Sequence, residues 1–487
     1  MFKFGSKPIP ADHSENSKIF RKLANKEAYQ LDLHTLDRHR NKSITCHYTP
    51  SPNHPFNSNR LIRIVETAII DVLLLHPILQ AGLVDADSKH PAWKQLQQIN
   101  LDEHLTWRFL QTPEDFDDVS RELTLSEIDG KFHEMKEKPG WRIFVSDQER
   151  NIEDDTTTSP LILLPLTPIL PPPIEGLYKV PLSMSSLAKD LLELFIPAAT
   201  SRTKVTLANW APIHLIPYST QHRSFSISKT TLHDIHLACW KKNSTLISLL
   251  HALMTISLAS QLDESTASAF QSCTSLDLRQ LIPSISSPSK YSELNVERVM
   301  GIYEKSISHK FDKKLVAQLR DKLPGNANQD LLLSPGQLRQ IWRIGAGICR
   351  ETERKVAKGL TGDSAGALKF IENWRQRLKN TSKRPRKFSW SITNAGTFDG
   401  NSKIDNKNPS AESELEGRDT WILHRAGFAS SAETMGADFV ISLVSFQTAG
   451  LSVDVSWLDS VCDVTMGERV TANLRKWLEQ IAEEAYP

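Results

Sequence analysis

Apolar and polar residues alternate strictly near the C-terminal end of this chain, between positions 451 and 457. The apolar positions are Leu451, Val453, Val455 and Trp457, and the polar positions between them are Ser452, Asp454 and Ser456. A period of two predicts a β-strand with one buried face. The run from 439 to 446 is more uniformly apolar and predicts a second strand, and Ala449-Gly450 predicts the turn between the two. We therefore expect strands 439–446 and 451–457 to pair as an antiparallel hairpin.

Patterning elsewhere predicts an α/β protein. Amphipathic or apolar runs predict helices at 60–76, 182–194, 230–240, 244–260, 310–322, 335–358 and 466–485. Shorter runs predict strands at 79–84, 141–146, 223–227 and 388–393. Because helices and strands alternate irregularly, we expect two α/β sandwiches with mixed sheets. The irregular stretch 198–222 predicts the crossover between an N-terminal half, 1–210, and a C-terminal half, 223–487. The polar stretch 399–418 predicts a mobile insertion.

Composition narrows the class of protein. The chain has 487 residues, of which 39% are hydrophobic and 24% charged, which is ordinary for a soluble globular protein. The formal net charge of +1 argues against nucleic acid or an anionic membrane as the main partner. The apolar stretch 68–75 is too short to span a bilayer, and the first residues lack the apolar run of a signal peptide. Five scattered cysteines without a CxxC pair indicate neither a disulfide framework nor a zinc site. We expect a cytoplasmic monomer.

Seven short segments, in this order along the chain, carry a family resemblance. They are 76–108 (beginning HPILQAGLV), PGWRIFV at 139–145, TLISLLHALMTISLA at 245–259, LDLRQLIP at 276–283, MGIY at 300–303, TNAGTFDG at 393–400 and the run 421–457. Each segment alone is weakly specific, whereas the order that the segments share with the family is more specific. Together they resemble the fungal alcohol O-acetyltransferase-like proteins, which belong to the chloramphenicol-acetyltransferase-like acyltransferases together with plant BAHD enzymes and peptide-synthetase condensation domains.

The resemblance implies a fold and an activity. The fold would be two chloramphenicol-acetyltransferase-like α/β sandwich domains with mixed sheets, separated by a tunnel. Acyl-CoA would enter this tunnel from one side, and an alcohol or amine acceptor from the other. In the family, the histidine of an HHxxxDG motif takes the acceptor's proton, while the motif aspartate is mainly structural. We therefore expect an acyl-CoA-dependent O-acyltransferase that acetylates an alcohol in fungal secondary metabolism, with acyl-CoA as co-substrate and no bound cofactor or metal.

The sequence departs from this pattern at the motif itself. The segment 170–176 reads LPPPIEG, so Pro171 occupies the place of the catalytic histidine, Glu175 that of the aspartate, and Gly176 matches the glycine. Proline has no side-chain base. Either the lineage has lost the base and become a catalytically inactive binding protein, or residues 155–180 reflect a wrong reading frame or splice junction. A general base contributes about 10²–10⁴-fold to a rate, so slow transfer could survive its loss.

Other residues are weaker candidates, and each has a simpler interpretation. His251, in an apolar helix, is a possible substitute base or a buried structural histidine. Asn394 and Gly396 either line the substrate channel or only form a turn. The resemblance makes Arg279 structural, and we expect Glu175 to pair with it at the inter-domain channel.

A serine esterase is a third and weaker possibility. The segment 362–366 matches the nucleophile-elbow pattern GxSxG, with Ser364 as the nucleophile. That elbow needs a buried strand just before the serine, whereas the preceding residues are charged and helix-like. His233 and His236 lie three residues apart, but no further metal ligands are in register with them.

Overall fold

A computed structural model describes residues 19–50, 58–110, 115–148, 161–164, 170–177, 204–279, 299–321, 332–358, 371, 373–398, 421–447 and 449–484. The predicted helix 182–194, the polar stretch 399–418 and the GxSxG segment lie outside the described residues.

A six-stranded mixed sheet forms the C-terminal half, in the order β11-β10-β12-β14-β15-β9. Its strands are β9 (Thr220–Ile227), β10 (Phe270–Asp277), β11 (Glu304–Phe311), β12 (Phe388–Phe398), β14 (Ala437–Phe446) and β15 (Gly450–Leu458). The pairs β10–β12 and β12–β14 are parallel, and the others are antiparallel. The hairpin predicted from the alternating pattern is confirmed, because β14 and β15 pair antiparallel across Gly450, whose φ of +102° suits glycine.

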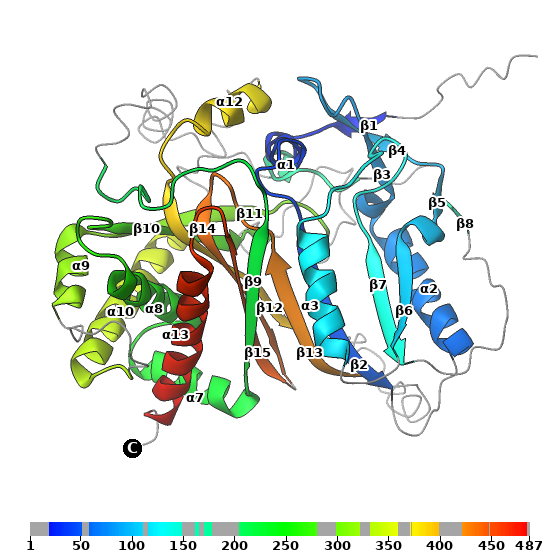
Figure 1. The fold of residues 1–487 in the computed structure, drawn as a ribbon. Helices are drawn as coiled ribbons and strands as arrows, with labels where there is room; N and C mark the ends of the chain where they lie inside the picture. The colour runs from blue at the N-terminus through cyan, green and yellow to red at the C-terminus, as the bar shows by residue number, and fades with distance from the viewer. Residues whose placement is uncertain are drawn as a thin grey trace, which may run out of the picture.

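Helices cover one face of this sheet, and the other face is turned toward the N-terminal half (Figure 1). The covering helices are α7 (Lys229–Lys241), α8 (Leu246–Gln261), α9 (Lys313–Arg320), α10 (Pro335–Ala357) and α13 (Val464–Glu483), while α12 (Trp374–Thr381) packs against α1. The most buried helix is α8, in which every residue from 248 to 259 is buried. The helices predicted from sequence in this half are therefore confirmed, with boundaries shifted by a few residues.

The N-terminal half is built from small sheets and helices. Its strands are β1 (Ile19–Lys22), β2 (Lys42–Pro50), β3 (Ala81–Val84), β4 (Ala92–Gln95), β5 (Gln98–Asn100), β6 (Leu105–Leu110), β7 (Ile143–Gln148) and β8 (Leu161–Leu163). Its helices are α1 (Asn25–Thr35), α2 (Ser58–Leu75), α3 (Asp115–Ile128) and α4 (Ile174–Leu177), with 3₁₀ turns η1 (Pro77–Gln80) and η2 (Leu101–Glu103). The strands β6 and β7 pair in parallel. One apolar core packs α2 against β5, β6 and β8.

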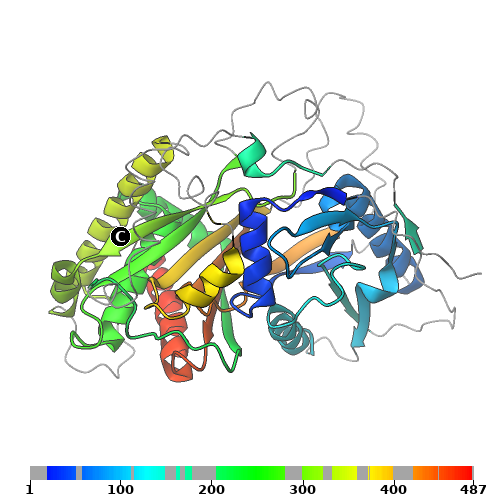
Figure 2. The same cartoon turned by 90° about the horizontal axis from the view of Figure 1, so that it is seen from above.

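One strand from the second half of the sequence pairs with the first half. Strand β13 (Trp421–Ser430) follows β12 in the chain but pairs antiparallel with β2, from Trp421 opposite Pro50 to Ser430 opposite Lys42. The two strands lie side by side between the large sheet and the N-terminal helices (Figures 1 and 2). The sequence did not predict this strand, and the division at 210 and 223 stays a prediction.

Candidate functional site

A large cavity lies between the two halves. Its volume is about 2180 Å³, and residues from both halves line it. The helix α2 contributes an apolar wall, formed by Leu61, Ile64, Val65, Ala68 and Ile69. The strands β9 and β15 contribute polar side chains, those of His222, Ser224, Ser452 and Asp454. The cavity is therefore placed where the family resemblance implies a tunnel.

The polar side chains on β9 and β15 lie on the sheet face that looks away from the helices. On β15 the apolar positions 451, 453, 455 and 457 belong to the core beneath α7, α8 and α13, and so do Phe225 and Ile227 of β9. The intervening residues therefore point to the opposite face, toward the cavity and β13. Every residue of β15 is buried, including Asp454 and Ser456. The expectation of a single buried face was wrong, because the N-terminal half and β13 cover the polar face.

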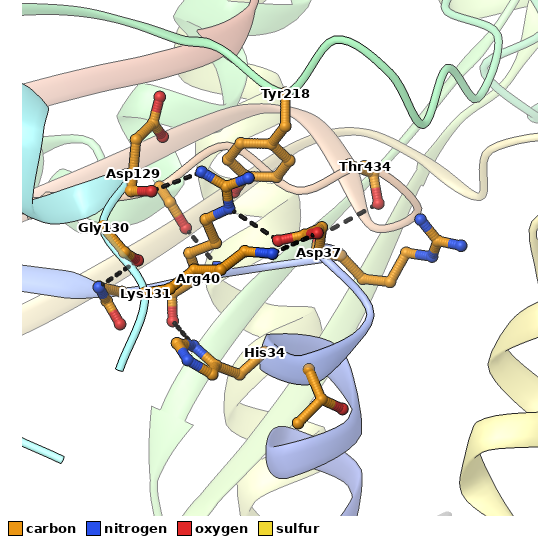
Figure 3. A network of polar contacts seen from close by, with 12 residues as sticks. His34, Asp37, Arg40, Asp129, Gly130, Lys131, Tyr218 and Thr434 are labelled. Carbon is orange, nitrogen blue, oxygen red and sulfur yellow. Dashed lines mark hydrogen bonds and ion pairs between the residues drawn. The ribbon is translucent and has the colours of Figure 1, made fainter. Parts of the chain in front are cut away.

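A polar network fixes the start of β9 against the N-terminal half. After α3, the carboxylate of Asp129 accepts from the backbone N–H of Thr220 at 2.8 Å and from its hydroxyl at 2.5 Å. The guanidinium of Arg40 lies over the ring of Tyr218 at 4.1 Å and donates to the Asp129 carbonyl and to Asp37 (Figure 3). These contacts position the strand that carries His222, two residues beyond Thr220.

His222 and Asp454 form a buried pair on the cavity wall. The Nε2 atom of His222 lies 2.9 Å from Oδ1 of Asp454, and both side chains are 5% exposed. Strand register makes the two residues diagonal neighbours, because Asp454 is opposite Ser224 and Ser456 is opposite His222. The other carboxylate oxygen of Asp454 accepts the backbone N–H of Phe428 at 3.2 Å. The Nδ1 atom of His222 is buried and has no hydrogen-bond partner among the described residues.

The degenerate motif lies beside the cavity. Leu170, Pro171, Pro172 and Ile174 are buried, but none of the residues 170–175 lines the cavity. The Pro172 carbonyl accepts the hydroxyl of Tyr303 at 2.6 Å, and Tyr303 does line the cavity. The Pro171 carbonyl accepts from Arg21 at 3.1 Å. The motif segment therefore contacts a residue of the cavity lining, Tyr303, without lining the cavity itself.

The predicted ion pair between Glu175 and Arg279 is wrong. Arg279 pairs with Asp277 at 3.0 Å and donates to the Val299 carbonyl at 3.1 Å, and its guanidinium lies 5.1 Å from the centre of the Tyr303 ring. Within the described part of the chain, neither carboxylate oxygen of Glu175 has a hydrogen-bond partner. Asp277, two residues before Arg279, also accepts the backbone N–H of Arg279 at 3.0 Å, so the acid that pairs with Arg279 is a near neighbour in the chain. The contacts of Arg279 agree with a structural role through a different acid.

His251 lies in the core of the C-terminal half, away from the cavity lining. Its Nδ1 accepts the indole N–H of Trp390 at 2.8 Å, and its Nε2 lies 2.7 Å from the hydroxyl of Thr274. Burial and the neighbouring His309 hold the pKa of His251 well below its usual value. Both ring nitrogens are therefore occupied, and the simpler interpretation, a buried structural histidine, describes its surroundings.

The remaining candidate residues divide between cavity and turn. Asn394 lines the cavity, whereas Gly396 does not. The side-chain oxygen of Asn394 accepts the N–H of Gly396 at 2.9 Å, and Gly396 has a φ of +92°, so the turn chemistry is also present.

Within the described ranges, no cluster of His, Cys, Asp and Glu side chains could hold a metal ion, and His233 and His236 are exposed. No single described helix is long and apolar enough to cross a membrane, and only α7 and α8 taken together, across an 89° bend, pass that test.

Comparison with known proteins agrees with this arrangement. No family model matches the chain. The sequence is 18% identical to a probable alcohol acetyltransferase of Fusarium pseudograminearum, over 97% of each chain. Among solved structures, the trichothecene 15-O-acetyltransferase from Fusarium sporotrichioides superimposes with a TM-score of 0.63 at 11% identity, covering 94% of this chain and 95% of that one. The condensation domain of the monacolin K polyketide synthase superimposes with a TM-score of 0.52 at 10% identity, covering 96% and 98%.

The fold and the cavity between its halves define the structural class. The chain has the two-domain, mixed-sheet fold of the chloramphenicol-acetyltransferase-like acyltransferases and condensation domains. Within that class it is similar over nearly its whole length to fungal acetyltransferases, as the resemblance in the sequence indicated.

Proposed function

We propose that this protein is an acyl-CoA-dependent O-acyltransferase that transfers an acetyl group to an alcohol. The observation that carries the proposal is the cavity between the halves, which has one apolar wall and one polar wall. The similarity to a probable alcohol acetyltransferase supports the choice of an alcohol as acceptor. A role in fungal secondary metabolism, which the family resemblance implies, is part of the proposal.

The size of the cavity supports simultaneous binding of two substrates. Small-molecule sites usually measure about 300–1,000 Å³, and this cavity is about twice the upper value, at 2180 Å³. The pantetheine arm of acyl-CoA and an acceptor could therefore occupy it together. Direct transfer needs no acylated side chain, because the acceptor oxygen attacks the thioester carbonyl and coenzyme A leaves as its thiol. Holding both reactants in this geometry supplies a large part of the rate.

The apolar wall indicates the kind of acceptor. Residues of α2 line the cavity over more than two helical turns, from Leu61 to Leu73. Apolar contact with such a wall favours an alcohol with a substantial hydrocarbon part over a small, fully hydrated one. The cytoplasmic location and the monomeric state expected from the sequence stay predictions.

Thiol release measures this activity directly. Purified protein is incubated with acetyl-CoA and a panel of alcohols of graded apolar area, and free coenzyme A is followed with a thiol reagent. We expect acceptor-dependent thiol release that increases with the apolar area of the alcohol, and an ester product detected by mass spectrometry. Binding of acetyl-CoA without any ester would instead support the inactive protein that Pro171 suggests.

A further inference from the structure

We propose that His222 is the general base of this site and that Asp454 holds it in the reactive tautomer. The inference rests on the proposed function, because it assigns the proton-accepting residue of that transfer. It places the base on β9, in the wall formed by the C-terminal half, and not in the segment 170–176 where the family motif belongs.

The first argument is location. His222 and Asp454 both line the cavity and project from the sheet face that is turned away from the helix core. The face alternation along β9 and β15 is strict, so the pair cannot turn toward the helices without a shift in strand register. The network at Asp129 and Thr220 holds β9 in this register against the N-terminal half.

The second argument is the state of each ring nitrogen. An ionised carboxylate only accepts hydrogen bonds, so Nε2 of His222 must carry the proton that it donates to Oδ1 of Asp454 at 2.9 Å. In the neutral ring this leaves Nδ1 with a lone pair. That atom is buried and has no partner among the described residues. An unpaired buried acceptor is costly to a fold, so a ligand hydroxyl that donates to it would remove a defect.

The third argument is that Asp454 is itself fixed. Its Oδ2 accepts the Phe428 N–H at 3.2 Å, and the Ser452 hydroxyl lies 3.5 Å away. Phe428 belongs to β13, the strand that pairs with β2 of the N-terminal half. The carboxylate is therefore held at the junction of the two halves, with one oxygen left for the histidine. A base oriented by a fixed acid is the arrangement that proton abstraction requires.

The chemical step balances without any further reactant. Nδ1 of His222 takes the hydroxyl proton of the acceptor while the acceptor oxygen forms a bond to the thioester carbonyl carbon. Collapse of the tetrahedral intermediate breaks the carbon–sulfur bond. The imidazolium then returns its proton to the leaving sulfur, which gives coenzyme A and the ester. Asp454 stabilises the imidazolium but stays ionised.

Two substitutions separate this role from a structural one. His222→Gln retains a side-chain N–H for Asp454 but carries no base. Asp454→Asn keeps an oxygen that can accept the Phe428 N–H, yet its amide would donate to Nε2 and force the proton onto Nδ1, which is the wrong tautomer. His233→Gln, an exposed histidine on α7, is the matched control. Each variant is assayed for thiol release, for acetyl-CoA binding by calorimetry and for melting temperature.

We expect both His222→Gln and Asp454→Asn to lower kcat by about 10²-fold or more, with the affinity for acetyl-CoA unchanged and the control equal to wild type. A wild type that transfers acetyl groups, with variants that remain folded and retain kcat, would overturn the assignment and leave the proposed function standing. A wild type that binds acetyl-CoA but releases no thiol with any alcohol would overturn both. If His222→Gln does not fold, the kcat of a folded Asp454→Asn variant tests the assignment: a loss of about 10²-fold supports it, and an unchanged kcat overturns it.

Discussion

Arg386 offers the sharpest test of what holds the segments at one end of the large sheet in place. Its side chain is fully buried, with 0% exposure, just before β12. The guanidinium donates to the carbonyl oxygens of Ala211, Glu433 and Ala437 at 3.0, 2.7 and 3.2 Å. Ala211 lies in the segment before β9, Glu433 lies in the connection from β13 to β14, and Ala437 is the first residue of β14. One side chain therefore ties together three backbone segments that frame the sheet.

The magnitude follows from these contacts. In Arg386→Met the three carbonyls lose a charged donor, and each buried acceptor left unpaired costs about 1–3 kcal/mol. Relaxation and entering water reduce the total, so we expect a loss of about 3–5 kcal/mol, the usual range for removing one member of a buried charged cluster. For a chain of 487 residues that corresponds to a fall in Tm of about 3–5 °C.

The loss should depend on pH in a defined direction. Burial raises the pKa of Asp438 from 3.8 to about 6, although Arg386 opposes the rise. Because the folded pKa lies above the unfolded one, the native state binds more protons between these values, and stability falls as pH rises through that window. Without Arg386 the pKa of Asp438 rises further, and the window extends upward. The variant should therefore lose more stability at about pH 8 than at about pH 5.

Thermal unfolding at both pH values checks this account. Lys383→Met is the matched control, because Lys383 is an exposed cation three residues away, and it should change stability by less than about 0.5 kcal/mol. The reasoning would be refuted by an Arg386→Met protein that melts within about 2 °C of wild type, or by a loss that is larger at the lower pH.

Two further predictions concern packing and the motif. A Cβ at Gly467 would lie 2.2 Å from ring atoms of the fully buried Trp457, so Gly467→Ala should lower the stability by about 1–3 kcal/mol. A Cβ at Gly347 would have no atom within 4 Å, so Gly347→Ala should raise the stability by up to about 1 kcal/mol. Equal shifts in melting temperature for the two variants would contradict this account of the packing. A histidine grafted at position 171, Pro171→His, should not restore thiol release to His222→Gln, because residues 170–175 do not line the cavity. Recovery of the rate would return the base to the motif.

The sequence predicted the elements of the C-terminal half well, because hydrophobic periodicity reports directly which side of an element is buried. The hairpin and the helices α7, α8, α10 and α13 all follow from that periodicity. The cap of a helix is harder to predict. Thr245 caps α8 by accepting the Ser248 N–H, although Asn243 and Ser244 just before it are also residue types that favour a cap. Neighbouring polar residues compete for such a position, and their order is decided by backbone geometry that the sequence does not report.

Long-range pairing was not predictable in the same way. Nothing local in 421–430 indicates that this strand leaves its own half to pair with 42–50. The polar face of β15 was also misjudged, because alternation shows that two faces differ but not what covers the polar one. The alternation was itself the signal that could have found the site. Asp454 stands in the middle of a strand buried on both faces, where an acid needs a partner or a function.

His222 was missed for a related reason. Residues 198–222 were interpreted as an irregular crossover, although β9 begins at Thr220 and its period of two includes His222 and Ser224.

The basic cluster 383–387 shows the opposite case. Five residues in a row, four of them basic, favour either a steering surface for an anionic ligand or a solvated loop, yet Arg386 within the cluster is fully buried. Charge alone does not distinguish a surface cation from one that satisfies backbone carbonyls in the interior.

The two members of the buried pair can be separated by what each one does for the fold. Asp454 accepts the Phe428 N–H, so it contributes to the junction of β13 with the large sheet even without a substrate. His222 donates to the other carboxylate oxygen and so satisfies part of that buried charge, but its second nitrogen is buried without a partner among the described residues. Apolar residues of similar volume can replace a whole buried ionic pair at little or no cost in stability, whereas removing one partner alone costs about 3–5 kcal/mol. Stability therefore accounts for the hydrogen bond between the two residues but not for the unpartnered Nδ1 atom, which the proposed role in proton transfer explains.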